Sequence, residues 1–150
     1  MKPFPVVICC LILALLISGC SMRERWQPSV RIVAIEYQAE LGTLEAQLRI
    51  NNRQDSPRSI ESLSSRLWIN DELIAEQQGE MKLQIPSRGV EVVRIDADAV
   101  SETVAEALTQ LQPVSYFIEV TFKTSDSSRL VKAEHEGRLD PAPGAPGRYR

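Results

Sequence analysis

Strict alternation of apolar and polar residues over positions 44–51 constrains the fold of this chain more than any other feature. The apolar positions are Leu44, Ala46, Leu48 and Ile50, and the residues between them are Glu45, Gln47, Arg49 and Asn51. Successive side chains of a β-strand point to opposite faces of a sheet, so the pattern puts one face against a core and the other in water. The chain therefore has to contain a sheet with one solvated face.

Other short segments of β character surround this strand. They cover residues 30–37, 63–69, 73–75, 82–85, 90–97, 114–123 and 129–139. Turn-forming residues separate them: an Asn-rich break at 51–57, a hairpin at 70–72, and a Pro-to-Gly connection at 86–89. The first of them, 30–37, carries apolar residues on both faces, which predicts a strand covered on both sides. Seven or eight strands within residues 29–139 predict an all-β, antiparallel sandwich of the immunoglobulin or fibronectin III type.

One segment has helical periodicity. Between residues 99 and 112 the apolar positions Val100, Val104, Leu108 and Leu111 fall on one stripe, and Pro113 ends the pattern. Asp98 or Ser101 is available as the N-cap. We expect one short helix that forms a crossover or a lid over one end of the sandwich.

The last residues, 140–150, contain three prolines and two glycines. They offer almost nothing apolar to bury, so the composition predicts a disordered tail.

The chain begins like an exported protein. Lys2 precedes an apolar run of 14 residues at positions 4–17, which small residues connect to Cys20. A bilayer core needs roughly 20 apolar helical residues, so a permanent transmembrane helix is the weaker alternative. Trp26, a few residues later, either dips into a membrane interface or packs on the domain.

The motif Ile17-Ser18-Gly19-Cys20 resembles the lipobox of bacterial lipoproteins. This resemblance implies a signal peptide at residues 1–19, cleavage after Gly19 and lipid on Cys20, with residues 20–28 as lipidated cysteine and tether. Ser21 is similar to the residue at this position in outer-membrane lipoproteins, which favours the periplasmic side of the outer membrane; the inner membrane is the alternative. An ordinary signal peptide followed by a free cysteine is the rival interpretation.

Several features of residues 44–95 occur in a specific order. They are the alternating strand, Asn51-Asn52, Pro57, Ile60 and Leu63, Trp68-Ile69-Asn70, Leu73-Ile74-Ala75, Ile85-Pro86, and Gly89 before Val90-Glu91-Val92. This order resembles the type 2 late embryogenesis abundant (LEA2) family, also called the water stress and hypersensitive response (WHy) domain. The chain departs from the family pattern in two places: Asn51-Asn52-Arg53 stands where the family has Asn-Pro-Asn, and Glu76 stands where it has glycine. The resemblance implies a fibronectin III-like sandwich with a protective or binding role under stress and no known reaction.

The residues that carry chemistry elsewhere form no catalytic pattern here. His135 is the only histidine, and its neighbours Glu134 and Glu136 would point to the opposite face of a strand. Asp96 and Asp98 lack the further oxygen ligands of a calcium loop and suit a strand end and a helix cap. Cys9 and Cys10 lie in the predicted signal, and Cys20 is consumed by lipid, which leaves no thiol. We expect no enzyme, cofactor, metal or small-molecule substrate.

Charge and composition leave surfaces as the candidates. Beyond residue 19 the chain has 16 basic and 20 acidic side chains, interspersed, which argues against a nucleic-acid partner. The leading hypothesis is a non-enzymatic lipoprotein, held in the membrane through Cys20, that gives stress or desiccation protection or binds envelope components. The alternatives are an adaptor or structural subunit with an envelope protein partner and, more weakly, a carrier of an apolar ligand between the sheets or under the helix.

Overall fold

The computed structural model describes residues 25–150. The predicted signal peptide, its cleavage residues Ile17, Ser18 and Gly19, and the predicted lipidation site Cys20 lie outside the described residues. Within 25–150, no helix is long and apolar enough to cross a membrane. Both sheets and the buried cluster between them lie within this range, so residues 25–150 have a core of their own.

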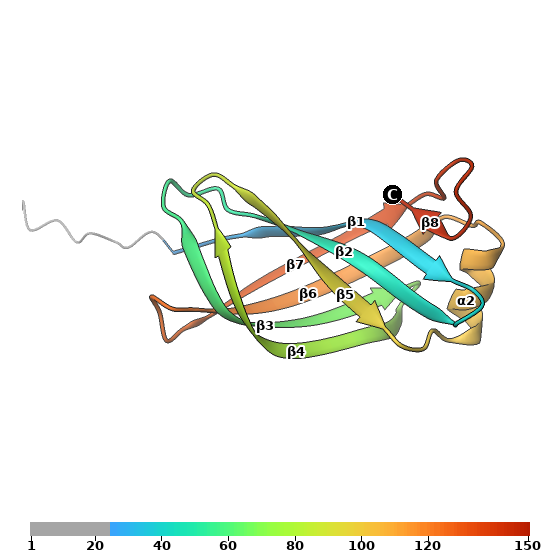
Figure 1. Ribbon diagram of the computed structural model, residues 1–150, viewed down its shortest axis with the longest axis horizontal. Helices are drawn as coiled ribbons and strands as arrows, with labels where there is room; N and C mark the ends of the chain where they lie inside the picture. Colours follow the sequence, from blue (N-terminus) through green and yellow to red (C-terminus); the bar gives the residue numbers. More distant parts are fainter. Residues whose placement is uncertain (1–24) are drawn as a thin grey trace, which may run out of the picture.

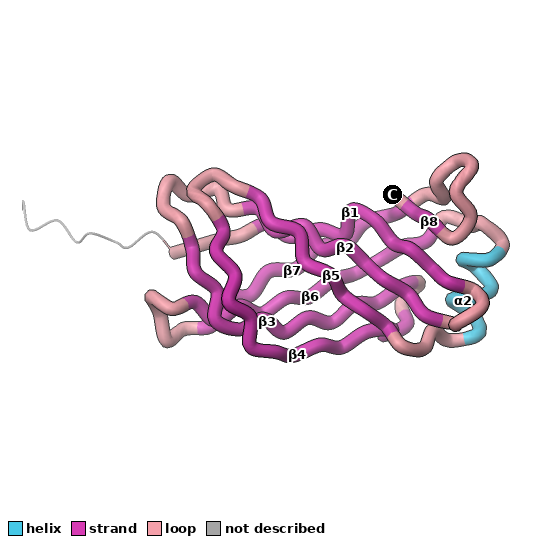
Figure 2. The backbone as a smooth tube through the Cα atoms, in the orientation of Figure 1, coloured by secondary structure: helices cyan, strands magenta, loops and turns pink. Residues whose placement is uncertain are grey.

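The predicted all-β antiparallel sandwich is confirmed (Figures 1 and 2). The elements are β1 (Ser29–Gln38), β2 (Thr43–Asn51), β3 (Arg58–Ile69), β4 (Glu72–Ile85), β5 (Val90–Ala97), α2 (Glu102–Thr109), β6 (Val114–Thr124), β7 (Leu130–Leu139) and β8 (Arg148–Tyr149). The first sheet has the order β5-β2-β1-β8 and the second the order β4-β3-β6-β7. Because β4 pairs with β3 and not with β5, the strands divide differently from those of an immunoglobulin constant domain.

The alternation in β2 sets the inner face of the first sheet. Its four apolar residues, Leu44, Ala46, Leu48 and Ile50, are all at most 2% exposed. In the second sheet, β6 has the same regular alternation and contributes buried residues that include Ile118, Val120 and Phe122. Each fully buried Leu, Ile, Val or Phe contributes about 1.5–3 kcal/mol relative to its exposed state, so these two strands supply much of the core.

The strand β1 is not covered on both sides, and that expectation was wrong. Its pairing with β2 shifts register between Ile32 and Ala34, which marks a β-bulge. A bulge inserts one residue and reverses the side-chain phase. As a result Ile32 before it and Ile35 after it are both buried in the same core, at 2% and 1% exposure.

The segments predicted as two strands, 73–75 and 82–85, form the single strand β4. Its turn with β3 has Asn70 at φ 49° and Asp71 at φ 67°, the left-handed pair that a two-residue hairpin requires. The polar middle of β4 continues because β3 supplies its backbone partners throughout. An edge strand needs few inward side chains, and only Ala75 and Ile85 are buried.

The helix α2 is shorter than the predicted 99–112 and crosses from the first sheet to the second at one end of the sandwich (Figure 1). Of the two candidate caps, Ser101 is the one used: its Oγ accepts from the Val104 amide at 3.3 Å. Val104 and Leu108 are buried as the stripe predicts. Leu111 has left-handed backbone, φ 55°, and is 47% exposed because it lies beyond the helix.

The tail 140–150 is ordered, and the prediction of disorder was wrong. Tyr149 is 1% exposed, β8 pairs with β1, and the Tyr149 hydroxyl donates to the Leu108 carbonyl at 2.8 Å. The Tyr37 amide donates to the Gly147 carbonyl at 2.7 Å. Gly147 has φ +76°, and a Cβ there would lie 2.4 Å from the Tyr37 carbonyl oxygen. One large aromatic residue and a few backbone hydrogen bonds therefore outweigh the composition of the segment.

Candidate functional site

His135 does not form a catalytic group with its neighbours. It is exposed on β7, with its ring stacked on Tyr116 and its Nδ1 3.0 Å from the Tyr116 hydroxyl. Burial raises the pKa of the Tyr116 hydroxyl. A Cβ at Gly137 would lie 2.8 Å from that oxygen, so this glycine leaves the space that the tyrosine occupies. The contact between Tyr116 and His135 thus packs the edge strand β7 against β6.

The other suspected ligands are also spread out. Asp96 and Asp98 are both exposed, the first on β5 and the second just after it. Over the described part of the chain, no group of three or more His, Cys, Asp or Glu side chains is arranged to hold a metal ion.

The chain enters the sandwich through a buried tryptophan, so residues 26–28 of the predicted tether 20–28 belong to the folded domain. Trp26 is 4% exposed and packs edge to face on Phe122, with ring centroids 5.3 Å apart. Pro28 is buried as well. Of the two positions considered for Trp26, packing on the domain is the one observed.

Asn52 connects Trp26 to two loops. Its Oδ1 accepts from the Trp26 Nε1 at 3.1 Å and from the Gln54 amide at 3.2 Å. Its Nδ2 donates to the carbonyl oxygens of Ser56 at 2.9 Å and Pro86 at 3.0 Å. The residue is 0% exposed, and this amide group is fully hydrogen-bonded, as a buried polar group must be.

The structural role of Asn52 was not predicted, although the sequence contains its signal. Position 52 continues the even-numbered, inward-facing series of β2 by one step, so its side chain enters the core. An asparagine in that position needs partners for both atoms of its amide. The Asn-rich break is thus a turn built around one buried side chain.

The end of the sandwich through which the chain enters is called the N-terminal end here and consists of residues 25–28, 52–58, 86–89 and 125–132. An open cleft of about 1450 Å³ lies there. It is lined by Arg25, Trp26, Gln27, Gln54, Asp55, Ser56, Arg58, Thr124, Asp126, Ser127, Arg129, Leu130, Val131 and Lys132. The cleft is therefore the meeting point of the entering segment and two loops.

Two ion pairs connect the segments of the N-terminal end. Arg58 pairs with Asp126, and Arg88 pairs with Asp55. The hydrogen bond from Thr124 and the charge of Arg58 lower the pKa of Asp126. The hydrogen bond and the charge of Arg88 lower the pKa of Asp55. Both aspartates are therefore ionised at neutral pH.

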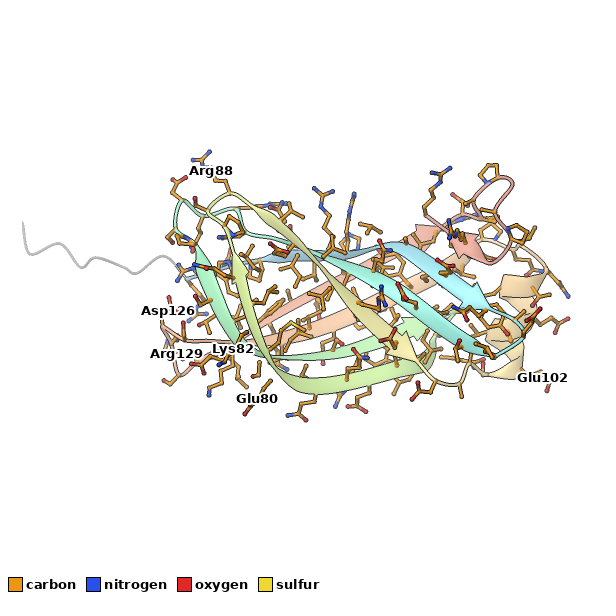
Figure 3. All side chains as sticks on the ribbon, viewed as in Figure 1. Glu80, Lys82, Arg88, Glu102, Asp126 and Arg129 are labelled. Carbon is orange, nitrogen blue, oxygen red and sulfur yellow. The ribbon has the colours of Figure 1, made fainter. Side chains whose placement is uncertain are left out.

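The two ends of the sandwich carry opposite charge. The N-terminal end has six basic side chains and two acidic ones, Asp55 and Asp126. The helix end, residues 39–42, 70–71, 98–113 and 140–147, has six acidic side chains and no Lys or Arg of its own, although Arg138 and Arg150 adjoin it at Asp140. Figure 3 places Arg88 and Arg129 at one end and Glu102 at the other. The described chain is thus an elongated dipole with its positive end where the chain enters.

Comparison with solved structures agrees with the sandwich. A solution structure of a protein from Arabidopsis thaliana has a TM-score of 0.51 at 7% identity, over 75% of this chain and 77% of that one. A solution structure of a late embryogenesis abundant (LEA) protein has a TM-score of 0.43 at 12% identity, over 93% of this chain and 87% of that one. A protein from Archaeoglobus fulgidus gives 0.42 at 6% identity, over 79% and 98%. No protein-family model matches the chain, and no curated protein matches it by sequence.

At such identities the comparisons describe the fold alone. The similarity to the Arabidopsis thaliana structure, with a TM-score above 0.5, supports the antiparallel sandwich expected from the sequence.

Proposed function

We propose that the protein is a non-enzymatic lipoprotein of the cell envelope, held in the membrane by lipid on Cys20. The observation that carries the proposal is the position of Ile17-Ser18-Gly19-Cys20. Ile17 ends an apolar run of 14 residues, and Cys20 lies only six positions before Trp26, the first buried side chain of the described residues. A cleavage and lipidation motif belongs at such a boundary between export signal and folded domain. Ser21 favours the outer membrane, with the domain on its periplasmic side.

The short link has a mechanical consequence. Six residues span at most about 21 Å when fully extended, and Trp26 is fixed to the core through Phe122 and Asn52. The sandwich then stays within a few nanometres of the membrane. Any binding takes place at that range.

Replacing Cys20 tests the anchor. Cys20→Ala should move the protein from the membrane fraction to the soluble fraction, whereas Ser21→Ala should leave it in the membrane fraction. Unchanged membrane fractionation of Cys20→Ala contradicts the lipid anchor. Density-gradient separation of inner and outer membranes from the same cells tests the location that Ser21 favours.

For the role of the sandwich we propose protection of other envelope molecules under drying or osmotic stress. The resemblance of residues 44–95 to the LEA2/WHy family supports it. A deletion strain should lose viability on drying or osmotic shock, and the purified domain should preserve the activity of a labile enzyme through drying. Normal survival together with no protection of the enzyme rules the role out.

The second candidate is an adaptor in an envelope assembly, and the helix end favours it. Two leucines there, Leu41 and Leu111, are 69% and 47% exposed beside six acidic side chains, a surface suited to a basic partner with an apolar spot. A photo-crosslinker at position 41 in living cells should capture one defined protein, and a crosslinker at Arg66, in the middle of β3, should not. Capture of no protein at position 41 removes the adaptor role.

Carriage of an apolar ligand is the weakest candidate. Side chains from both sheets pack into one cluster in the space between them. A carrier would have to displace part of that cluster. Native mass spectrometry of the purified domain should find the mass of the protein alone; a co-purified lipid would revive this function.

A further inference from the structure

We propose that the N-terminal end of the sandwich is a docking surface for anionic phospholipid headgroups, on which the domain stands with its helix end directed away from the bilayer. The six basic side chains there are Arg25, Arg53, Arg58, Arg88, Arg129 and Lys132. Residues 25–150 as a whole have 15 basic and 19 acidic side chains, so outside this end acids outnumber bases by 17 to nine. The N-terminal end therefore has a net positive charge, whereas the rest of the domain has a net negative charge.

Four of these six cations, Arg25 included, have no ion pair within the described residues and remain free for a ligand. Arg58 and Arg88 each pair with an aspartate. Arg53, Arg129 and Lys132 are exposed and form no ion pair with another side chain of residues 25–150. A phosphate oxygen accepts strong, charge-assisted hydrogen bonds from such groups, and a bilayer offers many phosphates in one plane.

An apolar residue stands among the cations. Leu130 is 63% exposed at the start of β7, between Arg129 and the half-buried Val131. The loop that connects β6 to β7 extends at the N-terminal end, beside the point where the chain enters (Figure 1). An exposed leucine flanked by cations suits the boundary between headgroups and acyl chains, where the apolar side chain is buried and the charges stay with the phosphates.

The charge separation of the domain and the proposed lipid anchor favour the same orientation, with the N-terminal end at the membrane. The orientation rests on the proposed lipid at Cys20, which would hold the N-terminal end next to the membrane. The strand β4 has 14 residues, about 46 Å at 3.3 Å per residue. The helix end then lies several Debye lengths from the surface at physiological salt, and its six acidic side chains avoid the anionic plane.

Vesicle binding by the domain without its lipid tests the surface apart from the anchor. The chain from Ser21 onward retains every described contact and contains no cysteine. It should co-sediment with vesicles of phosphatidylcholine and phosphatidylglycerol, and not with phosphatidylcholine alone. Added salt should weaken the binding, because counterions screen exposed charges.

Matched charge variants locate the surface. Replacing Arg53, Arg129 and Lys132 by Gln should lower the partition coefficient roughly 100-fold, at about fivefold per cation removed near an anionic surface. The control replaces Arg138, Arg148 and Arg150 by Gln, which changes the net charge equally, and should have little effect. Equal losses in the two variants would mean that net charge acts alone, and an unchanged first variant would mean that the N-terminal end is not the surface; either outcome overturns the proposal.

A single fluorescent label reports which end touches the bilayer. Because the chain from Ser21 has no other thiol, Leu130→Cys and Leu41→Cys can each carry one environment-sensitive dye. The dye at position 130 should shift to the blue with phosphatidylglycerol vesicles, and the dye at position 41 should not. A shift at position 41 only reverses the orientation and contradicts the proposal, as does absence of binding to either vesicle, which would leave this end for a protein partner. Since this chain has no lipid, failure of lipidation at Cys20 would not alter these results.

Discussion

The amide of Asn52 provides the sharpest test of how the chain enters the fold. Asn52→Ala would leave the buried Trp26 indole N–H without its acceptor, and a buried donor without a partner costs about 1–3 kcal/mol. The lost bonds to Gln54, Ser56 and Pro86 involve groups that water can reach and add about 1 kcal/mol together. We therefore expect a loss of about 2–4 kcal/mol, a large part of the 5–15 kcal/mol typical of a domain.

Urea unfolding, followed by tryptophan fluorescence and circular dichroism, measures this loss. A double-mutant cycle with Trp26→Phe isolates the indole bond, because phenylalanine keeps an aromatic ring against Phe122 and removes the N–H. In that background Asn52→Ala should cost about 1–2 kcal/mol less than in the parent. Asn51→Ala, on the preceding residue of β2, should change stability by less than about 0.5 kcal/mol. An equal cost of Asn52→Ala in both backgrounds would refute the account of the hydrogen bond.

Three further predictions concern stability. Ser65 is buried and its hydroxyl has no partner among the described residues. Ser65→Ala should therefore be neutral or stabilise the protein by up to about 1 kcal/mol. A loss of stability in thermal unfolding would show an unrecognised partner. Gly147→Ala should cost about 2–4 kcal/mol through φ strain and the clash with Tyr37, whereas Gly144→Ala, with φ +71° but nothing within 4 Å, should cost only about 1–2 kcal/mol; equal costs would contradict the close approach. The pKa of Asp126 lies below its ordinary 3.8, so its contribution is present above pH 3.8 and is lost as the pH falls through the lower, folded value. Asp126→Asn should be less stable than the parent at neutral pH, and the difference should vanish in acid; a constant difference from pH 7 to pH 2 would contradict the sign.

The architecture was predictable wherever one local rule determines burial. The alternation in β2 and β6 fixes which face enters the core, because side-chain direction in a strand follows the backbone. The hairpin at Asn70-Asp71 followed from residue types that tolerate left-handed backbone. The helix was found from its stripe, although its ends were placed too far out, since a stripe does not record where the backbone leaves the helix.

The remaining features depend on tertiary contacts that composition and period do not record. The bulge in β1 adds a residue without changing the apolar content, so the sequence looked like a strand covered on both sides. The polar middle of β4 is held by pairing with β3 and needs no apolar signal. The tail was judged by its prolines and glycines, whereas the Tyr149 side chain docks it against α2. Asn52 was classed as a turn residue because a buried asparagine is recognised only through its partners.

The charge separation between the two ends was equally hidden in the sequence. Acidic and basic residues are interspersed along the chain, and the net charge is small. The antiparallel topology brings every second connecting segment to the same end, which sorts the charges. The count of charges along the sequence therefore argued only against a nucleic-acid partner, whereas the fold shows that the charges differ between the two ends.

Mass spectrometry of the N-terminal peptide from the membrane fraction tests the central claim most directly. Trypsin should release residues 20–23 as the first peptide, with lipid on Cys20 and with residues 1–19 absent. An unmodified Cys20, or a peptide that still contains residues 1–19, would contradict the lipid anchor that the proposed function depends on.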